Sequence, residues 1–223
     1  LGVLVACASA GIIIGVVTKT GVGLRLASGL IDLAGGMLLP AMFFTMITAI
    51  VLGMGVPTTA NYVITSTIAA PALEQMGVPV LAAHMFVFYF GIIADVTPPV
   101  ALAAYAGAGI SGGNALKTGV HASKLAIAAF IIPYVFVLSP VLLMVDATPL
   151  ALVSVTISAL LGMIAVSSAL CGFLADHCRP YERLLLIAAG LLMIAPGSTT
   201  DLVGLALFVV ILVMQYRRAK EAA

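Results

Sequence analysis

The sequence predicts an all-α protein that crosses the membrane several times. Hydrophobic residues make up 63% of the 223 residues, charged residues make up only 8%, and the mean hydropathy is +1.29. A soluble domain would be about a quarter charged. Two long apolar runs, 37–73 and 82–110, are broken near their middles by residues that helices disfavour. Composition and these two breaks together predict helical spans, some of them interrupted.

Charge and motifs exclude several classes of protein. A net charge of +1 provides no basic surface for nucleic acid. The chain has no GxxxxGK[ST] phosphate loop, so we do not expect it to hydrolyse ATP. It begins with Leu1 and has no charged segment before the first apolar run, so we expect it to be part of a longer protein.

The three cysteines are predicted to be packing thiols. Cys7, Cys171 and Cys178 are odd in number and lie in or beside apolar runs. Cys171, His177 and Cys178 suggest a zinc site only weakly, because two of them are adjacent and no fourth ligand is near.

The first half of the chain is predicted to contain a span, a surface helix and a hairpin. Residues 1–17 read as a span, and 18–33, which contain three charged residues, as an amphipathic helix at the membrane interface. The run 37–73 has arms of about 15 to 19 residues, which reach only ~22–28 Å at ~1.5 Å per residue. Since the hydrocarbon core is ~30 Å thick, a re-entrant helical hairpin fits better than two full spans.

The remaining elements are predicted to be spans of different kinds. Residues 82–110 form one span made of two half-helices, and 119–145 and 148–174 form ordinary spans. Residues 184–195 and 202–215 flank a PGSTTD turn, and they are either short crossings or a second re-entrant pair.

Lys and Arg positions predict the orientation. The loop with Lys117 and Lys124 is cytoplasmic, as are Arg179 with Arg183 and the C-terminal cluster at 217–220. The open end of the hairpin, residues 74–79, then lies outside. Lys19 and Arg25 also fall outside, against the rule.

The first break, GMGVPTTAN at 53–61, has the chemistry of a ligand site. Gly53 and Gly55 allow the backbone to turn, and Pro57 ends the incoming helix. Freed carbonyls at the end of the first arm suit a hard cation, and free N–H groups at the start of the second suit a carboxylate. The alternative is a kink capped by Thr58 and Thr59, with no ligand.

The second break, ADVTPP at 94–99, separates two half-helices because neither proline donates a backbone hydrogen bond. Asp95 is the only acid in its run, and an intramembrane carboxylate suggests a functional site by default. The alternative is that Asp95 caps the following half-helix near Val100. A pair of interrupted segments points to the binding site of a transporter.

Both breaks also carry a family resemblance. GMGVPTTANYVITSTIAAPAL and LAAHMFVFYFGIIADVTPPVALAAYAGAGI resemble the second repeat of the large membrane subunit of tripartite ATP-independent periplasmic (TRAP) transporters. The resemblance is greatest to fused permeases that work with TAXI-type binding proteins. It covers 1–145, and 146–223 resemble the C-terminal hydrophobic extension of some fused permeases.

The resemblance implies half of an inverted-repeat secondary transporter, driven by sodium and working by an elevator-type shift. It implies import of small organic acids delivered by a periplasmic substrate-binding protein. The first repeat and the small-subunit-like helices are absent from these residues. The expected location is the bacterial or archaeal cytoplasmic (inner) membrane, in contact with the lipid bilayer.

The predicted site combines both breaks, with sodium as coupling ion and no other cofactor. The residues assigned to substrate binding are Pro57, Thr58, Thr59, Asn61, Thr97 and Pro98. Those assigned to sodium are Gly53, Gly55, Thr58, Asp95 and Thr97.

Two other functions remain as alternatives. Residues 109–113 match G-x-S-x-G around Ser111, with His121 following, which would suggest an intramembrane serine hydrolase. That motif needs a strand-to-helix turn, so we expect a loop here and no enzyme. A passive channel or structural subunit is the other alternative, although a channel would show repeated rings of carbonyls or charges. We expect 146–223 to act as a scaffold, with Asp201 in a turn between short helices.

Overall fold

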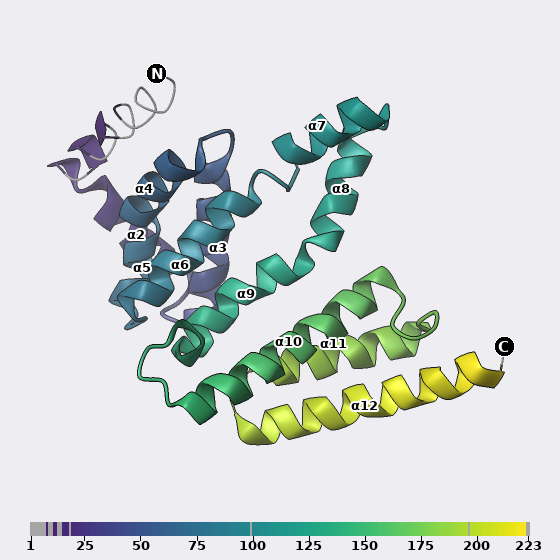
Figure 1. The fold of residues 1–223 in the computed structure, drawn as a ribbon. Helices are drawn as coiled ribbons and strands as arrows, with labels where there is room; N and C mark the ends of the chain where they lie inside the picture. Colours follow the sequence, from purple (N-terminus) through teal and green to yellow (C-terminus); the bar gives the residue numbers. More distant parts are fainter. Residues whose placement is uncertain are drawn as a thin grey trace. The chain divides into compact units, whose positions relative to one another are not determined.

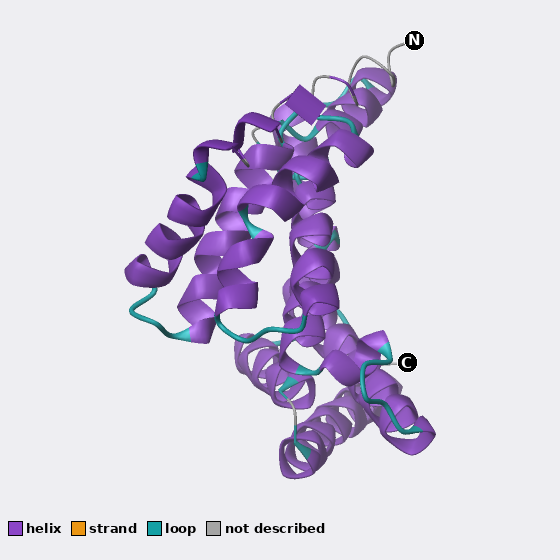
Figure 2. Ribbon diagram, turned by 90° about the vertical axis from the view of Figure 1, so that its left-hand side faces the viewer, coloured by secondary structure: helices purple, strands orange, loops and turns teal. Residues whose placement is uncertain are grey.

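The computed structural model describes residues 8, 11–12, 15–17, 19–98, 100–195 and 197–221. Among these, helices are joined by loops and no strand occurs (Figure 2). Internal contacts divide the chain into two compact units, Leu1–Val137 and Leu138–Ala223, which are described separately. Most of the predicted span 1–17 lies outside the described residues, and so does Cys7.

Two helical arms form the core of the first unit. Helix α3 (Leu38–Gly53) is followed by α4 (Thr58–Ile68) and the short α5 (Ala70–Gln75), and α3 packs against α4 (Figure 1). The 16 residues of α3 rise only ~24 Å. The second arm is divided at Ala69 because Pro71 cannot donate a hydrogen bond to the preceding turn. The re-entrant position of this hairpin remains a prediction.

A short helix covers the second arm. Helix α2 (Val22–Leu33) packs against α5 and buries Gly23 and Ala27. A Cβ atom at Gly23 would lie 2.9 Å from the Thr67 carbonyl oxygen, so the two backbones are in close contact. The helix begins four residues later than the predicted segment 18–33. Its location at a membrane interface remains a prediction.

The second interrupted segment consists of two helices, α6 (Val80–Ile93) and α7 (Leu102–Ser111). Helix α6 packs against α3, α4 and α5. Its Phe86 and Phe90 are fully buried, and both rings contact Tyr134 at centroid distances of 5.3 and 5.9 Å. This aromatic cluster holds α6 inside the unit.

The predicted span 119–145 is wrong at both ends. Helix α8 (Ala115–Leu125) begins earlier because the Asn114 side chain accepts a hydrogen bond from Lys117 N at 3.0 Å. It is followed at Ala126 by α9 (Ile127–Leu138), which contains Pro133. Residues 140–143 form a 3₁₀ turn, because Pro140 ends the α-helical hydrogen bonding.

The described residues of the second unit form the α-helices α10 (Pro149–Cys171), α11 (Pro180–Ile194) and α12 (Ser198–Glu221). Helix α11 packs along both of its neighbours (Figure 1). Glycines make this possible: a Cβ atom at Gly162 would lie 2.9 Å from the Gly190 carbonyl oxygen, and one at Gly204 2.7 Å from that of Ala189.

Three segments of the described chain are long and apolar enough to cross a membrane: Ala115–Leu138, Pro149–Cys171 and Thr199–Arg218. The last of these extends the predicted segment 202–215 at both ends. Asp201 therefore lies in the first turn of a long helix, and not in the turn that the sequence suggested.

Charged and polar side chains join one end of α11 to α12. Arg218 contacts Asp176 at 2.6 Å and Glu182 at 2.8 Å, and Gln215 Nε2 donates to Glu182 at 2.8 Å. Burial raises the pKa of Glu182, but hydrogen bonds from Arg218, the Arg179 backbone and Gln215 outweigh it and hold this pKa at about 2. The hydrogen bond from Arg218 likewise lowers the pKa of Asp176. Glu182 is thus buried as a carboxylate with its donors in place.

Candidate functional site

The tip of the hairpin consists of residues 54–57, between α3 and α4. Gly55 has φ +71°, a conformation that glycine adopts without steric cost. Pro57 has no N–H to donate to the Gly53 carbonyl, which instead accepts a long hydrogen bond of 3.4 Å from Val56 N. The carbonyl end of α3 is therefore weakly satisfied at the tip.

The amino end of α4 has no side-chain cap. Its N-cap residue is Pro57, which offers no side-chain acceptor, and Thr58 and Thr59 are exposed. The alternative of a kink capped by these threonines therefore lacks the hydrogen bonds that it requires. The first N–H groups of α4 remain open to an anion.

Two glycines bring the hairpin against α6. A Cβ atom at Gly53 would lie 2.5 Å from the Gly91 carbonyl oxygen, and one at Gly91 would lie 2.7 Å from Asn61 Oδ1. At Gly53 no side chain larger than hydrogen fits without movement of the backbone, and at Gly91 the Asn61 side chain would have to move. The Asn61 amide thus lies against both glycine backbones, at the contact between the two interrupted segments.

Asn61 brings an unsatisfied oxygen to this contact. The residue is 2% exposed, and its Oδ1 atom has no hydrogen-bond partner among the described residues. A buried amide oxygen without a partner costs about 1–3 kcal/mol. Such an atom requires an explanation, and a ligand is one of the few available.

The second break lies one helical turn beyond Gly91. Because Pro98 has no N–H, the carbonyl of Ala94 loses the donor that a continuous helix would supply. Thr97 Oγ1 donates to the Ile93 carbonyl at 2.9 Å, and the Asp95 carbonyl accepts from Ala103 N at 3.2 Å. The break therefore keeps a partly satisfied backbone, with Asp95 partly buried beside it.

Asp95 does not cap the next half-helix. Helix α7 begins after Ala101, which has φ +38°, and has no side-chain cap. The Asp95 backbone carbonyl, and not its carboxylate, takes up an N–H group of α7. This finding removes the capping role as the explanation for the acid.

Helix α8 supports the second break from the other side. A Cβ atom at Gly119 would lie 3.2 Å from Pro98 Cγ and 3.3 Å from Ala101 Cβ. Ser123 Oγ donates to the Gly119 carbonyl of its own helix at 2.9 Å and lies 3.5 Å from the Val96 carbonyl oxygen, the outer limit for a hydrogen bond. The broken segment is thereby held between two helices of the same unit.

The structure brings together only some of the predicted site residues. Gly53 and Asn61 contact α6 near the second break, whereas Gly55, Pro57, Thr58 and Thr59 are exposed at the tip. Asp95, Thr97 and Pro98 lie within the break itself, and Pro99 is outside the described residues. The ligand roles of all these residues remain predictions.

Sequence reasoning missed two features of this region. Gly91 appeared as a lone glycine in an apolar run, although glycine inside a helix is a recognised signal of close backbone approach. His84 of α6 contacts both helices of the second arm: its Nδ1 atom lies 2.9 Å from Tyr62 Oη in α4 and its Nε2 atom 3.1 Å from Glu74 Oε1 in α5. A histidine paired with two polar residues from other helices could not be recognised from spacing alone.

Ser111 has none of the geometry of a nucleophile elbow. It is the last residue of α7 and is followed by Gly112 with φ +71°, as at many helix ends. Its hydroxyl donates to the Ala108 carbonyl at 3.3 Å. The predicted loop therefore begins only at Gly112, and Ser111 lies at a helix end and not in the strand-to-helix turn that a hydrolase site needs.

Comparison with known proteins identifies a family for most of the chain. Residues 1–151 match the family described as Tripartite ATP-independent periplasmic transporter, DctM component. The matched region contains both interrupted segments and ends within α10. No curated protein and no solved structure matches the chain.

Proposed function

The chain belongs to the DctM family of tripartite ATP-independent periplasmic transporters, and on this basis we propose that it forms part of a sodium-coupled importer of small organic acids. Members of this family are the membrane permease components of such transporters. The apolar helices agree with a protein that crosses the membrane several times. Sodium coupling, substrate class and mechanism are our proposals.

The contact around Asn61 is the observation that best supports this function. It lies where the first interrupted segment meets the second, and it leaves a buried oxygen without a partner. Unwound backbone inside a membrane protein occurs where it lines a cavity or binds an ion. In transporters, such backbone carbonyls bind sodium, and half-helix amino ends bind anionic substrates.

We assign sodium to the oxygens between the hairpin and the second break. Gly53, Gly55 and Thr58 offer oxygens from the hairpin, and Asp95 and Thr97 offer them from the break. Pro57 and Pro98 support the assignment because neither has a backbone N–H. The helix carbonyl four residues earlier therefore lacks its usual hydrogen bond and can bind an ion. A monovalent hard cation suits such a set of oxygen atoms.

The substrate carboxylate is assigned to the amino end of α4. Pro57, Thr58 and Thr59 are exposed there, and the helix has no side-chain cap. The positive end of the helix dipole attracts an anion. Asn61, Thr97 and Pro98 complete the proposed substrate contacts, so that one tip serves sodium and substrate together.

An elevator-type movement fits the packing of the hairpin. The Gly53–Gly91 contact leaves no space between α3 and α6, so these helices move as one body. A periplasmic substrate-binding protein of the TAXI type would deliver the organic acid. The first repeat and small-subunit-like helices would complete the permease, in a bacterial or archaeal inner membrane.

Uptake by the intact permease in proteoliposomes tests the proposal. The binding protein, loaded with radiolabelled dicarboxylates and amino acids in turn, identifies the transported class. Uptake should require a sodium gradient and should fall at least tenfold for Thr58→Val or Thr59→Val. Thr48→Val is the matched control, because Thr48 Oγ1 only donates to the Phe44 carbonyl within α3. Equal sodium dependence in all three variants would contradict the assignment.

A further inference from the structure

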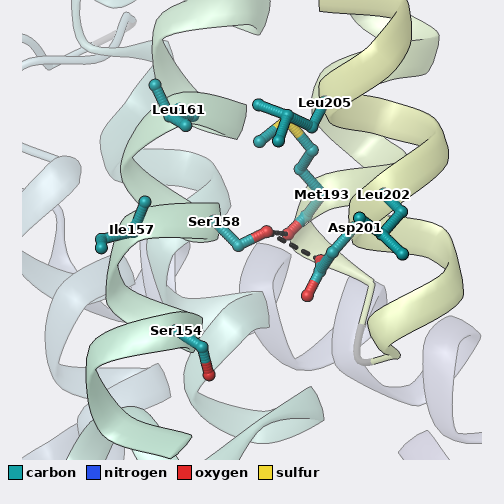
Figure 3. A pocket seen from close by; sticks show the side chains of 8 residues that line it. All are labelled: Ser154, Ile157, Ser158, Leu161, Met193, Asp201, Leu202 and Leu205. Atoms are coloured by element: carbon teal, nitrogen blue, oxygen red, sulfur yellow. Dashed lines mark hydrogen bonds between the residues drawn. The ribbon is translucent and has the colours of Figure 1, made fainter. Parts of the chain in front are cut away.

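The second unit contains a separate cluster of oxygens where its three helices meet. Ser158 Oγ of α10 lies 2.7 Å from Asp201 Oδ1 of α12 and 2.9 Å from the Met193 carbonyl oxygen of α11 (Figure 3). Ser158 is 8% exposed. A cavity of about 230 Å³ adjoins the cluster, with Ser154 as a further polar residue on a mainly apolar lining.

Within this cluster, Ser158 lies near the middle of α10, a helix long enough to span a membrane, whereas Met193 lies at the end of α11 and Asp201 at the start of α12. Ser158 follows Pro149, the first residue of the 23-residue α10, by nine positions. At ~1.5 Å per residue it is ~14 Å from one end of the helix and ~20 Å from the other. Asp201, in the first turn of α12, is hydrogen-bonded to this residue of α10. An acid that is hydrogen-bonded to another helix of a membrane protein suggests a functional site.

The negative charge of Asp201 has no basic side chain nearby. Helix α10 has no charged residue, and the charged residues of α11, Glu182 and Arg183, lie in its first turn at the far end. On α12 the nearest base is Arg217, sixteen residues away, or ~24 Å along the helix. The amino end of α12 contributes only about half a positive charge. Within the described unit, the carboxylate charge is therefore incompletely balanced.

The hydrogen count points in the same direction. The hydroxyl of Ser158 has one hydrogen, yet it lies within hydrogen-bond distance of two acceptors, a carboxylate and a carbonyl. When the Ser158 hydroxyl donates to Asp201, the Met193 carbonyl receives no hydrogen from it. When the hydroxyl donates to the Met193 carbonyl, the Asp201 carboxylate receives none. One additional positive charge would satisfy both oxygens.

We propose that Asp201, Ser158 and the Met193 carbonyl bind one monovalent cation, a proton or a sodium ion. A bound proton resides on the Asp201 carboxyl, which donates to Ser158 Oγ, and the Ser158 hydroxyl then donates to the Met193 carbonyl. A bound sodium ion contacts all three oxygens, and water in the adjoining cavity completes its shell. Both cations neutralise the carboxylate and join α10, α11 and α12.

This site goes beyond the proposed transport function. It lies outside residues 1–151, which match the family, and it uses none of the residues of the hairpin or the second break. Failure of either proposal therefore leaves the other intact. Its predicted effect is to stabilise the three-helix unit when the cation is bound.

The test uses the intact permease with three variants. Asp201→Asn removes the charge, and Ser158→Ala removes the shared hydroxyl while keeping the acid. Asp146→Asn is the matched control, since Asp146 is exposed in the loop before α10 and its φ of +50° is tolerated by asparagine. Folding of each variant is checked by gel filtration in detergent.

Two measurements distinguish the cations. If sodium binds, equilibrium binding of ²²Na⁺ to purified protein should fall by one ion per chain in Asp201→Asn and at least tenfold in affinity in Ser158→Ala. If a proton binds, the infrared C=O band of a protonated carboxylic acid at neutral pH should be absent in Asp201→Asn and shifted in Ser158→Ala. The control should match the unmodified permease in both measurements. If Asp201→Asn changes neither the sodium count nor the carboxylic-acid band, the proposal is wrong.

Discussion

Two glycines, Gly53 and Gly91, allow the hairpin to lie close against α6. Gly53 and Gly91 were not equally visible in the sequence: Gly53 lies in a motif with a proline and two threonines, whereas Gly91 is isolated in an apolar run. Its partner, Asn61, is thirty residues away along the chain. Periodicity describes one helix at a time, so it identified the tip residues but not the helix that they contact.

Gly91→Ala tests this contact. The added methyl group would lie 2.7 Å from Asn61 Oδ1, so the buried Asn61 side chain must move out of its contact with α6. We expect the variant to lose about 1–3 kcal/mol of stability, as overpacked cores do, and to lose most transport activity. Thermal unfolding in detergent and proteoliposome uptake measure the two effects.

Gly107→Ala provides the control for this change. No atom lies within 4 Å of a Cβ placed at Gly107, and its helix α7 is regular there. Alanine should stabilise that helix by up to about 1 kcal/mol. If both variants behave alike, the Gly53–Gly91 contact does not limit the approach of the helices.

The pKa of Glu182 predicts how the second unit responds to acid. Since its pKa is about 2 in the folded protein and 4.5 ordinarily, the folded state favours the carboxylate. This contribution to stability is fully present above pH 4.5 and is lost as the pH falls towards 2. Glu182→Gln should therefore reduce the decline in stability between these pH values, as followed by circular dichroism. The exposed Asp146→Asn should leave the decline unchanged, and an equal decline in Glu182→Gln would contradict the prediction.

At the scale of whole elements, local signals placed helix ends well where a cap was present. Helix α10 begins after Thr148, which accepts a hydrogen bond from Ala151 N, and ends before Gly172, which adopts φ +79°. Both ends lie close to those of the predicted span 148–174. The end predicted at 145 failed because apolar residues continue past Ser139 and Pro140 into a 3₁₀ turn. Hydropathy alone does not distinguish a helix from an apolar turn.

Removal of the Thr148 cap tests the start of α10. Thr148→Ala deletes the acceptor for Ala151 N, which lies 3.3 Å from the hydroxyl oxygen. The loss should be about 1 kcal/mol, measured by thermal unfolding. Thr156→Ala is the internal comparison, because Thr156 Oγ1 only donates to the Leu152 carbonyl at 2.6 Å and its loss should cost less. The reverse order of stability would show that the cap does not hold the first turn.

For the whole molecule, composition was sufficient to predict an all-helical membrane protein, and the family match agrees with it. The boundary predicted after residue 145 remains untested: contacts divide the chain after Val137, and the family match ends at 151. Packing between distant segments, such as α2 on α5, could not be derived from the sequence. It depends on which apolar helix faces are complementary in shape, and the order of residues within one helix does not show this. Orientation in the membrane also remains a prediction from the positions of Lys and Arg.

A cysteine at position 75 tests this orientation. Gln75 is exposed at the end of α5, the predicted open end of the hairpin. In a variant of the intact permease without other cysteines, Gln75→Cys should react with an impermeant thiol reagent added outside the cell. A cysteine at Leu116, exposed in the first turn of α8, should react only from the cytoplasmic side. Labelling of Gln75→Cys from the cytoplasm alone would invert the predicted topology.

The pairing of Glu182 with Arg218 has a consequence for the order of biosynthesis. The two residues are 36 positions apart, so the ribosome delivers the acid well before the base that it binds. During this interval the Glu182 carboxylate of α11 lacks its basic partner, and burial of an unpaired charge is energetically costly. Complete burial of Glu182 must therefore await the last turns of α12, although α11 can already pack against α10. Nascent chains that stop before Arg218 should expose Glu182 and become substrates for membrane quality-control proteases.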